Sequence, residues 1–173
     1  METPESNKQN LNAQLEGKAT IEHVIVGMKT VTELQDELAS KKINVDNHAI
    51  NMLASGDMTS SETSDHITLV RVRVIDLGII GELTTKKIFD RVEKLGLKLC
   101  TPKTGVYYRL QYTKQPHEEE IYIGMKQIIG MTDDGPYENI FGITNCEKGL
   151  ELKGISAEPS AVWHPNHEFI FEL

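Results

Sequence analysis

The chain has 173 residues, with 26 acidic against 18 basic side chains, six histidines, two cysteines and a formal net charge of −8. A hydrophobic fraction of 39% and a charged fraction of 25% are typical of one globular domain with a buried core, which excludes a wholly disordered chain. No apolar run reaches the roughly 18 residues that cross a bilayer and no signal peptide is evident, so we expect neither a membrane span nor export. Two cysteines favour a reducing cytoplasm, and the acidic charge argues against binding of double-stranded nucleic acid.

The N-terminal region differs in composition from the rest of the chain. Residues 1–19 are polar and offer few apolar side chains, so we predict a flexible tail there. A single domain is expected over residues 20–173, because a helical front of residues 20–56 cannot bury enough apolar surface to fold alone. The β-rich part of that domain is predicted over residues 66–173.

The helical front is predicted from three local signals. β-branched residues at 21–26 indicate a short strand. Thr30 with Glu33 three positions later matches the capping box that begins a helix. Asn44 or Asp46 is suited to cap a second, shorter helix, so we expect the two helices to form a hairpin over one face of the sheet.

The back of the chain has mainly the composition of strands. Residues 66–74 alternate between apolar and polar side chains, and a helix is predicted between the N-cap Thr84 and the C-terminal glycine Gly96. Turn sequences at 133–136 and 147–149 join consecutive strand candidates, which indicates antiparallel hairpins. The further strand-like segments are 105–113, 119–128, 137–146, 149–155 and 168–171. We therefore predict an α+β fold: a mainly antiparallel sheet with a few helices packed on one side.

A stretch rich in tyrosine carries the densest set of side chains suited to binding. If it forms a strand, its two-residue period places Tyr107, Arg109 and Gln111 on one face. A ring, a guanidinium and an amide in a row would suit a planar or anionic group. Arg71 and Arg73 would extend this face if their strand lies beside it. The alternative is an ordinary polar face of an antiparallel sheet.

Two histidines are weak candidates for a metal site. His164 and His167 could share a cation, and the acidic residues after His117 could add ligands. A proline lies between the two histidines, however, and indicates a solvated turn before the last strand. The acidic runs are likewise expected to be solvated, so we predict no metal ligand set.

Either cysteine could act as a nucleophile beside a histidine, but Cys100 and Cys146 both end apolar segments, where a thiol usually behaves as a small buried side chain. The sequence contains no phosphate-binding loop, dinucleotide-binding glycine motif or zinc-protease motif. We therefore predict no cofactor and no catalytic residue, and leave enzymatic activity as an open alternative.

Several stretches together resemble one protein family. They are VIDLG at 74–78, LGLKLCTP at 95–102, RLQYTKQP at 109–116 and WHP at 163–165. In this combination the chain resembles a family of short uncharacterised bacterial proteins with an LGL-x-LC…RLQY-x-x-QP pattern, from which Thr101 and Lys114 depart. That family has no established activity, so the resemblance implies no catalytic or binding residues. It implies a complete bacterial or bacterial-virus protein rather than a fragment.

Three functions are compatible with these observations. The first is a non-enzymatic binding or interaction domain that uses the face of Tyr107, Arg109 and Gln111, with an unknown protein or a small anionic ligand as its partner. The second is a hydrolase with a Cys–His pair. The third is an acidic inhibitor or immunity-type protein, which the net charge suggests. The absence of a catalytic motif favours the first.

Overall fold

The structure, a computed structural model, describes residues 14–58 and 63–173. Its eight strands form one sheet in the order β1-β3-β8-β4-β6-β7-β2, with β5 paired to β6 beside this path. The strands are β1 (Ala19–Val26), β2 (Asn44–Val45), β3 (Asp65–Arg73), β4 (Glu120–Ile123), β5 (Ile128–Thr132), β6 (Gly135–Cys146), β7 (Gly149–Ser156) and β8 (Glu168–Glu172). The helices are α2 (Val31–Ser40), α3 (Asn47–Leu53), α4 (Thr85–Lys94), α5 (Pro102–Gln111) and the short 3-10 helix η1 (Val74–Leu77).

The sheet is mixed, so the prediction of a mainly antiparallel sheet is wrong, although the α+β class is confirmed. The hairpins β5–β6 and β6–β7 are antiparallel, as their turn sequences predict. The C-terminal strand β8, however, inserts between β3 and β4 and runs parallel to β4, and β2 runs parallel to β7. Turn sequences report only the pairing of neighbours along the chain, so they carry no signal for these distant pairings.

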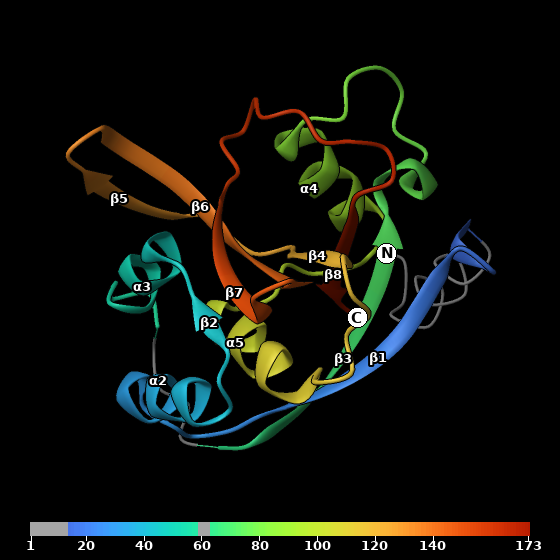
Figure 1. The fold of residues 1–173 in the computed structure, drawn as a ribbon. Coiled ribbons are helices and arrows are strands. Elements are labelled where there is room, and N and C mark those ends of the chain that lie inside the picture. The colour runs from blue at the N-terminus through green and yellow to red at the C-terminus, as the bar shows by residue number, and fades with distance from the viewer. Residues whose placement is uncertain (1–13, 59–62) are drawn as a thin grey trace.

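Helices cover both faces of the central strands, which corrects the prediction that they pack on one side (Figure 1). Phe89 of α4 packs edge-on against Phe171 of β8. Gly105 of α5 lies against Ile123 of β4, which is paired with Ile170 of β8. Because successive residues of a strand point to opposite faces, Ile170 and Phe171 identify two sides of the sheet. The central strands are therefore buried between α4 and α5.

The predicted helix starts at the front of the chain are confirmed. The Thr30 side chain accepts a hydrogen bond from the backbone of Glu33, and the Glu33 carboxylate accepts one from the Thr30 N–H at 2.7 Å. Of the two residues suggested for the second helix, Asp46 is the N-cap of α3, and its carboxylate accepts the Ala49 N–H at 2.7 Å. Each carboxylate satisfies a backbone donor that the first helical turn leaves unpaired.

The strand predicted over residues 105–113 is wrong, because this segment forms helix α5. The Thr101 hydroxyl accepts the Thr104 N–H at 3.2 Å, and Pro102 occupies the first helical position. The eight residues 103–110 are all buried, so the helix has no polar face and its sequence shows no helical period. Its valine and tyrosines, which favour strands, then suggested the wrong element.

The structure describes residues 14–19 of the predicted N-terminal tail. Residues 1–13 of the predicted tail and residues 59–62 of a predicted loop lie outside the described residues. Leu15 is 5% exposed and belongs to the core, and Gln14 accepts a hydrogen bond from Arg91 at 3.0 Å. Leu15 therefore packs against the domain, and Gln14, although exposed, is hydrogen-bonded to it. Over residues 14–58 and 63–173, no helix has both the length and the apolar character that a membrane span requires.

Candidate functional site

The three side chains predicted to share a strand face do not do so. Tyr107, Arg109 and Gln111 lie on α5, where Arg109 points roughly 200° away from each of the other two, while Tyr107 and Gln111, four residues apart, share one face of the helix. Arg109 consequently has different surroundings from the other two, whereas Tyr107 contacts the backbone of Lys29 and Gln111 that of Ile25.

Arg109 is a structural residue and not an accessible binding residue. Its side chain is 0% exposed and donates hydrogen bonds to the side chain of Gln115, to the carbonyl of Tyr112 and, at 3.4 Å, to the carbonyl of Thr144. Burial lowers the pKa of Arg109 to about 10, so the guanidinium is still protonated at neutral pH. Arg109 thus joins the C-terminal end of α5 to β6, and no ligand can reach it.

Arg71 does not extend the predicted face either. Its guanidinium pairs with Glu119 and Glu168, donates to the Tyr112 hydroxyl at 3.4 Å and lies 3.7 Å from the Glu22 carboxylate. Burial acts to lower the pKa of Arg71, but the hydrogen bonds to Glu119, Glu168 and Tyr112 raise it overall. These contacts join β1, β3 and β8 to the segment before β4, so the arginine is committed to the fold.

The remaining predicted binding and metal candidates make local contacts. Arg73 is exposed and pairs with Asp76 at 2.7 Å. His164 Nδ1 accepts the backbone N–H of Asn166 at 3.2 Å, and His167 Nδ1 accepts that of His164 at 3.3 Å. Both hydrogen bonds lie within the turn that precedes β8. Among the residues that the structure describes, no group of three or more histidine, cysteine or acidic side chains is placed to hold a metal ion.

The two cysteines do not form the arrangement that a Cys–His hydrolase needs. Cys100 is buried, its thiol lies 3.7 Å from the carbonyl of Ile170, and burial raises its pKa well above the ordinary value. Cys146 is half-buried at the end of β6. In the described parts of the chain, neither thiol hydrogen-bonds to an imidazole. A reactive thiolate requires such a partner or a similar source of positive charge.

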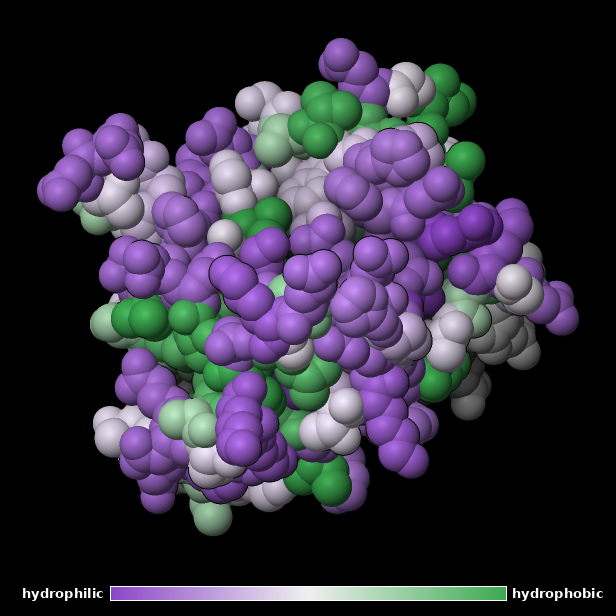
Figure 2. Space-filling view, viewed as in Figure 1, coloured by the Kyte–Doolittle hydropathy of each residue, from purple (hydrophilic) through white to green (hydrophobic). Residues whose placement is uncertain are grey.

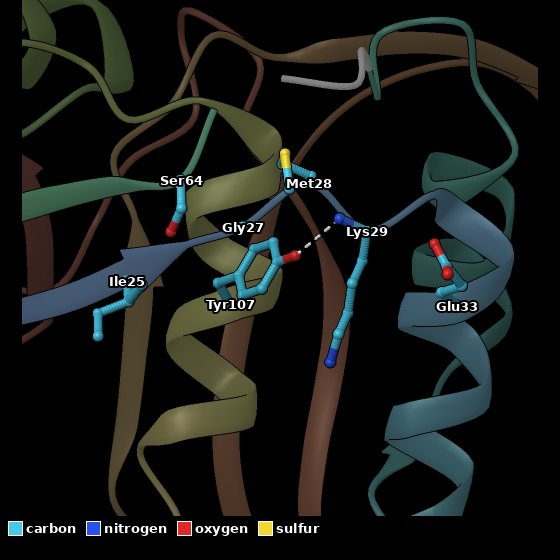
Figure 3. A pocket seen from close by; sticks show the side chains of 7 residues that line it. All are labelled: Ile25, Gly27, Met28, Lys29, Glu33, Ser64 and Tyr107. Carbon is cyan, nitrogen blue, oxygen red and sulfur yellow. Dashed lines mark hydrogen bonds between the residues drawn. The ribbon is translucent and has the colours of Figure 1, made fainter. Parts of the chain in front are cut away.

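Tyr107 instead forms one wall of a pocket where the end of β1 meets α2 and α5 (Figure 3). The pocket has a volume of about 460 Å³, within the range of roughly 300–1,000 Å³ that small-molecule sites occupy. Two of its apolar side chains are exposed, Ile25 by 47% and Met28 by 58%. We call this site the Tyr107 pocket, and its lining residues are Ile25, Gly27, Met28, Lys29, Glu33, Ser64 and Tyr107.

The Tyr107 hydroxyl is fixed by the chain segment that links β1 to α2. Its oxygen accepts the backbone N–H of Lys29 at 3.2 Å, as the dashed line in Figure 3 shows. A Cβ atom on Gly27 would lie 2.9 Å from this oxygen, so the close approach requires glycine. The phenolic O–H itself has no acceptor among the described residues. Tyr107 therefore offers a positioned donor that a ligand could use.

Of the charged side chains in and beside the Tyr107 pocket, Glu33 and Lys29 have partners, whereas Lys103 has none among the described residues. Glu33 is held by the capping box, and the Lys29 ammonium pairs with Glu37. Lys103, one helical turn before Tyr107, is only 6% exposed, and its Nζ has no hydrogen-bond partner among the described residues. Burial lowers the pKa of Lys103, while the charge of Glu33 acts in the opposite direction.

Sequence reasoning found only Tyr107 of this site. The pocket is assembled from segments far apart in the chain, so no local pattern joins Gly27 and Glu33 to Tyr107. The one available signal was the helix start at Thr101 and Pro102, which would place Lys103 and Tyr107 on one face of a helix.

Comparisons with other proteins supply no further assignment: no family model matches the chain, and no curated protein or solved structure matches it. The function is therefore inferred from the geometry of the Tyr107 pocket.

Proposed function

We propose that the protein is a non-enzymatic binding domain whose ligand is a small organic molecule seated in the Tyr107 pocket. The observation that carries this proposal is the phenolic O–H of Tyr107, which is held in place through its oxygen yet has no acceptor among the described residues. Beside it, Ile25 and Met28 expose apolar surface that a ligand would cover. A positioned polar group next to apolar walls is the usual composition of a small-molecule site.

A binding role is supported over a catalytic one by the state of the neighbouring groups. Glu33, the only carboxylate that lines the pocket among the described residues, already accepts hydrogen bonds from the backbone and hydroxyl of Thr30, the latter at 2.9 Å. A general base must instead be free to take a proton from the substrate. The ligand we expect is compact, with an apolar body against Ile25 and Met28 and an acceptor that faces Tyr107.

The proposal is tested with 4-methylbenzamide, a neutral probe that has an apolar ring and a carbonyl acceptor. At about 0.4 kcal/mol for each of its about ten heavy atoms, the expected Kd is about 1 mM. NMR titration should shift the methyl signals of Ile25 and Met28 and leave those of Ile129 and Met131, which are exposed on β5, unchanged.

Two tyrosine variants separate the pocket from non-specific binding. Tyr107→Phe removes the donor, and we expect it to weaken the probe about five- to tenfold, the effect of losing one hydrogen bond of about 1 kcal/mol. Tyr137→Phe is the matched control, since it removes a phenol on β6 that does not line the pocket. Equal affinity in both variants, or no shift at Ile25 and Met28 in the wild-type protein, would contradict the proposal.

A further inference from the structure

We infer that the Tyr107 pocket selects ligands that carry a carboxylate, and that the buried ammonium of Lys103 supplies this selectivity; the inference rests on the proposed function. The starting observation is that Lys103 is 6% exposed and that its Nζ has no hydrogen-bond partner among the described residues. Lysine is almost never buried without a partner, because an unpaired charge in a protein interior is costly. A ligand anion would supply the missing counter-charge.

Lys103 lies beside the pocket and is not one of its lining residues. Lys103 and Tyr107 are four residues apart on α5, so they lie on the same face of the helix, and Tyr107 forms a pocket wall. Glu33, another lining residue, lies close enough for its charge to act on the Lys103 ammonium, yet no ion pair forms between them. The capping box holds the Glu33 carboxylate toward Thr30 instead.

The two helix starts beside the pocket also favour a bound anion, whereas the Glu33 carboxylate in the lining opposes one. The helices α2 and α5 both begin near it, and the N-terminal end of a helix carries partial positive charge. Lys29 lines the pocket too, although its ammonium already pairs with Glu37. In a partly buried site, attraction between opposite charges is several times stronger than in water. A carboxylate gains from this field, whereas an amide of the same shape does not.

A carboxylate fits the available donors better than a phosphate does. The lining offers one free phenolic donor at Tyr107 and the hydroxyl of Ser64, the buried Lys103 ammonium lies outside the lining, and no arginine lines the pocket among the described residues. Phosphate sites usually provide a guanidinium fork or a row of backbone N–H groups. The volume of about 460 Å³ accommodates an aromatic or branched aliphatic acid.

The test compares 4-methylbenzoate with 4-methylbenzamide, which have the same number of heavy atoms and nearly the same shape. We expect the wild-type protein to bind the benzoate at least about tenfold more tightly than the benzamide. Lys103→Met should abolish that preference while it retains benzamide binding, and Lys103→Gln should give the same result with a polar side chain. Lys126→Met is the matched control: it removes an equal charge from an exposed lysine that does not line the pocket, so the preference should persist.

The outcomes separate the inference from the proposed function. Equal binding of both probes by the wild-type protein overturns the carboxylate selectivity and leaves the Tyr107 pocket as a binding site. A preference that survives in Lys103→Met and Lys103→Gln shows that another charge is responsible, which also overturns the inference. Failure of both probes to shift the signals of Ile25 and Met28 overturns the proposed function itself. Thermal unfolding of each variant, measured in parallel, establishes that the comparison is made on folded protein.

Discussion

The side-chain amide of Gln111 forms two hydrogen bonds with the backbone of Ile25. The Ile25 N–H donates to Gln111 Oε1 at 3.0 Å, and Gln111 Nε2 donates to the Ile25 carbonyl at 2.7 Å. A residue of a neighbouring strand would exchange the same pair of bonds, so the amide takes the place of a strand at the outer edge of β1. This contact fixes α5 against β1 immediately before the segment that contains Gly27 and Lys29.

Replacement of Gln111 by alanine should therefore affect both the fold and the Tyr107 pocket. Loss of two neutral hydrogen bonds, each worth about 0.5–1.5 kcal/mol, should lower the free energy of unfolding by about 1–3 kcal/mol in urea denaturation. Gln35→Ala is the control, because Gln35 is exposed on α2 and surface changes of this kind stay within about 0.5 kcal/mol. Equal stability of the two variants would show that the amide pair does not hold α5 in place.

Arg109 should prove essential to folding and not to ligand recognition. Arg109→Met leaves the acceptors on Gln115, Tyr112 and Thr144 unpaired inside the protein, and we expect a loss of about 3–5 kcal/mol of unfolding free energy. Arg109→Lys should rescue poorly, because a single ammonium cannot reach acceptors that the planar guanidinium spans.

The control for Arg109 is Arg73→Met, which removes an exposed arginine paired with Asp76 and should cost at most about 1 kcal/mol. Guanidinium denaturation of the two variants makes the comparison. If Arg109→Met is as stable as Arg73→Met and instead weakens a ligand, Arg109 acts in binding after all.

The elements that sequence reasoning predicted correctly are those with local signals. The capping box at Thr30, the N-cap at Asp46 and the turns around β6 involve residues within a few positions of one another. The parallel pairings of β8 with β4 and of β2 with β7 join distant segments, so nothing in either strand identifies its neighbour.

The candidate site was predicted less well because the contacts of its residues depend on burial, which the sequence does not show. An arginine between tyrosines suits a ligand-binding face, but on the enclosed helix α5 the guanidinium of Arg109 becomes an internal cross-link. Tyr107 remained in the site only because its hydroxyl reaches Gly27 and Lys29 on another segment. Such a contact depends on tertiary structure, which the local sequence does not contain.

The close approach of Gly27 to Tyr107 gives a direct test of how the pocket is built. Gly27→Ala would place a Cβ atom 2.9 Å from the Tyr107 hydroxyl oxygen, so the phenol must shift. We expect a loss of about 1–3 kcal/mol in stability, the usual cost of overpacking, and weaker binding of 4-methylbenzamide. In the double variant with Tyr107→Phe, the nearest ring atom lies 3.4 Å away, so much of the stability should return.

Denaturation of the two single variants and the double variant completes a mutant cycle for Gly27 and Tyr107. Contacting residues typically give a coupling energy of about 0.5–3 kcal/mol. Additive losses of stability would mean that the backbone at Gly27, and not the phenol, meets the new methyl group.

Lys103→Met should stabilise the ligand-free protein, in contrast to most core substitutions. At neutral pH the folded protein holds an ammonium with no partner among the described residues, and its replacement by an apolar side chain of similar length should add about 1–3 kcal/mol to the unfolding free energy. Lys126→Met, at an exposed lysine, should change stability by less than about 0.5 kcal/mol.

The gain from Lys103→Met should also depend on pH. Burial lowers the pKa of Lys103 in the folded protein below its ordinary value of 10.5, so between these two values the unfolded chain binds more protons than the folded one. Wild-type stability contributed by this group therefore rises with pH over that window, and the advantage of Lys103→Met over wild type should shrink as the pH approaches 10.5. The difference between the urea midpoints of the two proteins, measured across that pH range, reports this effect. Groups that titrate in both proteins contribute equally and drop out of the difference. A constant difference, or a destabilised Lys103→Met, would show that the ammonium is already paired in the free protein.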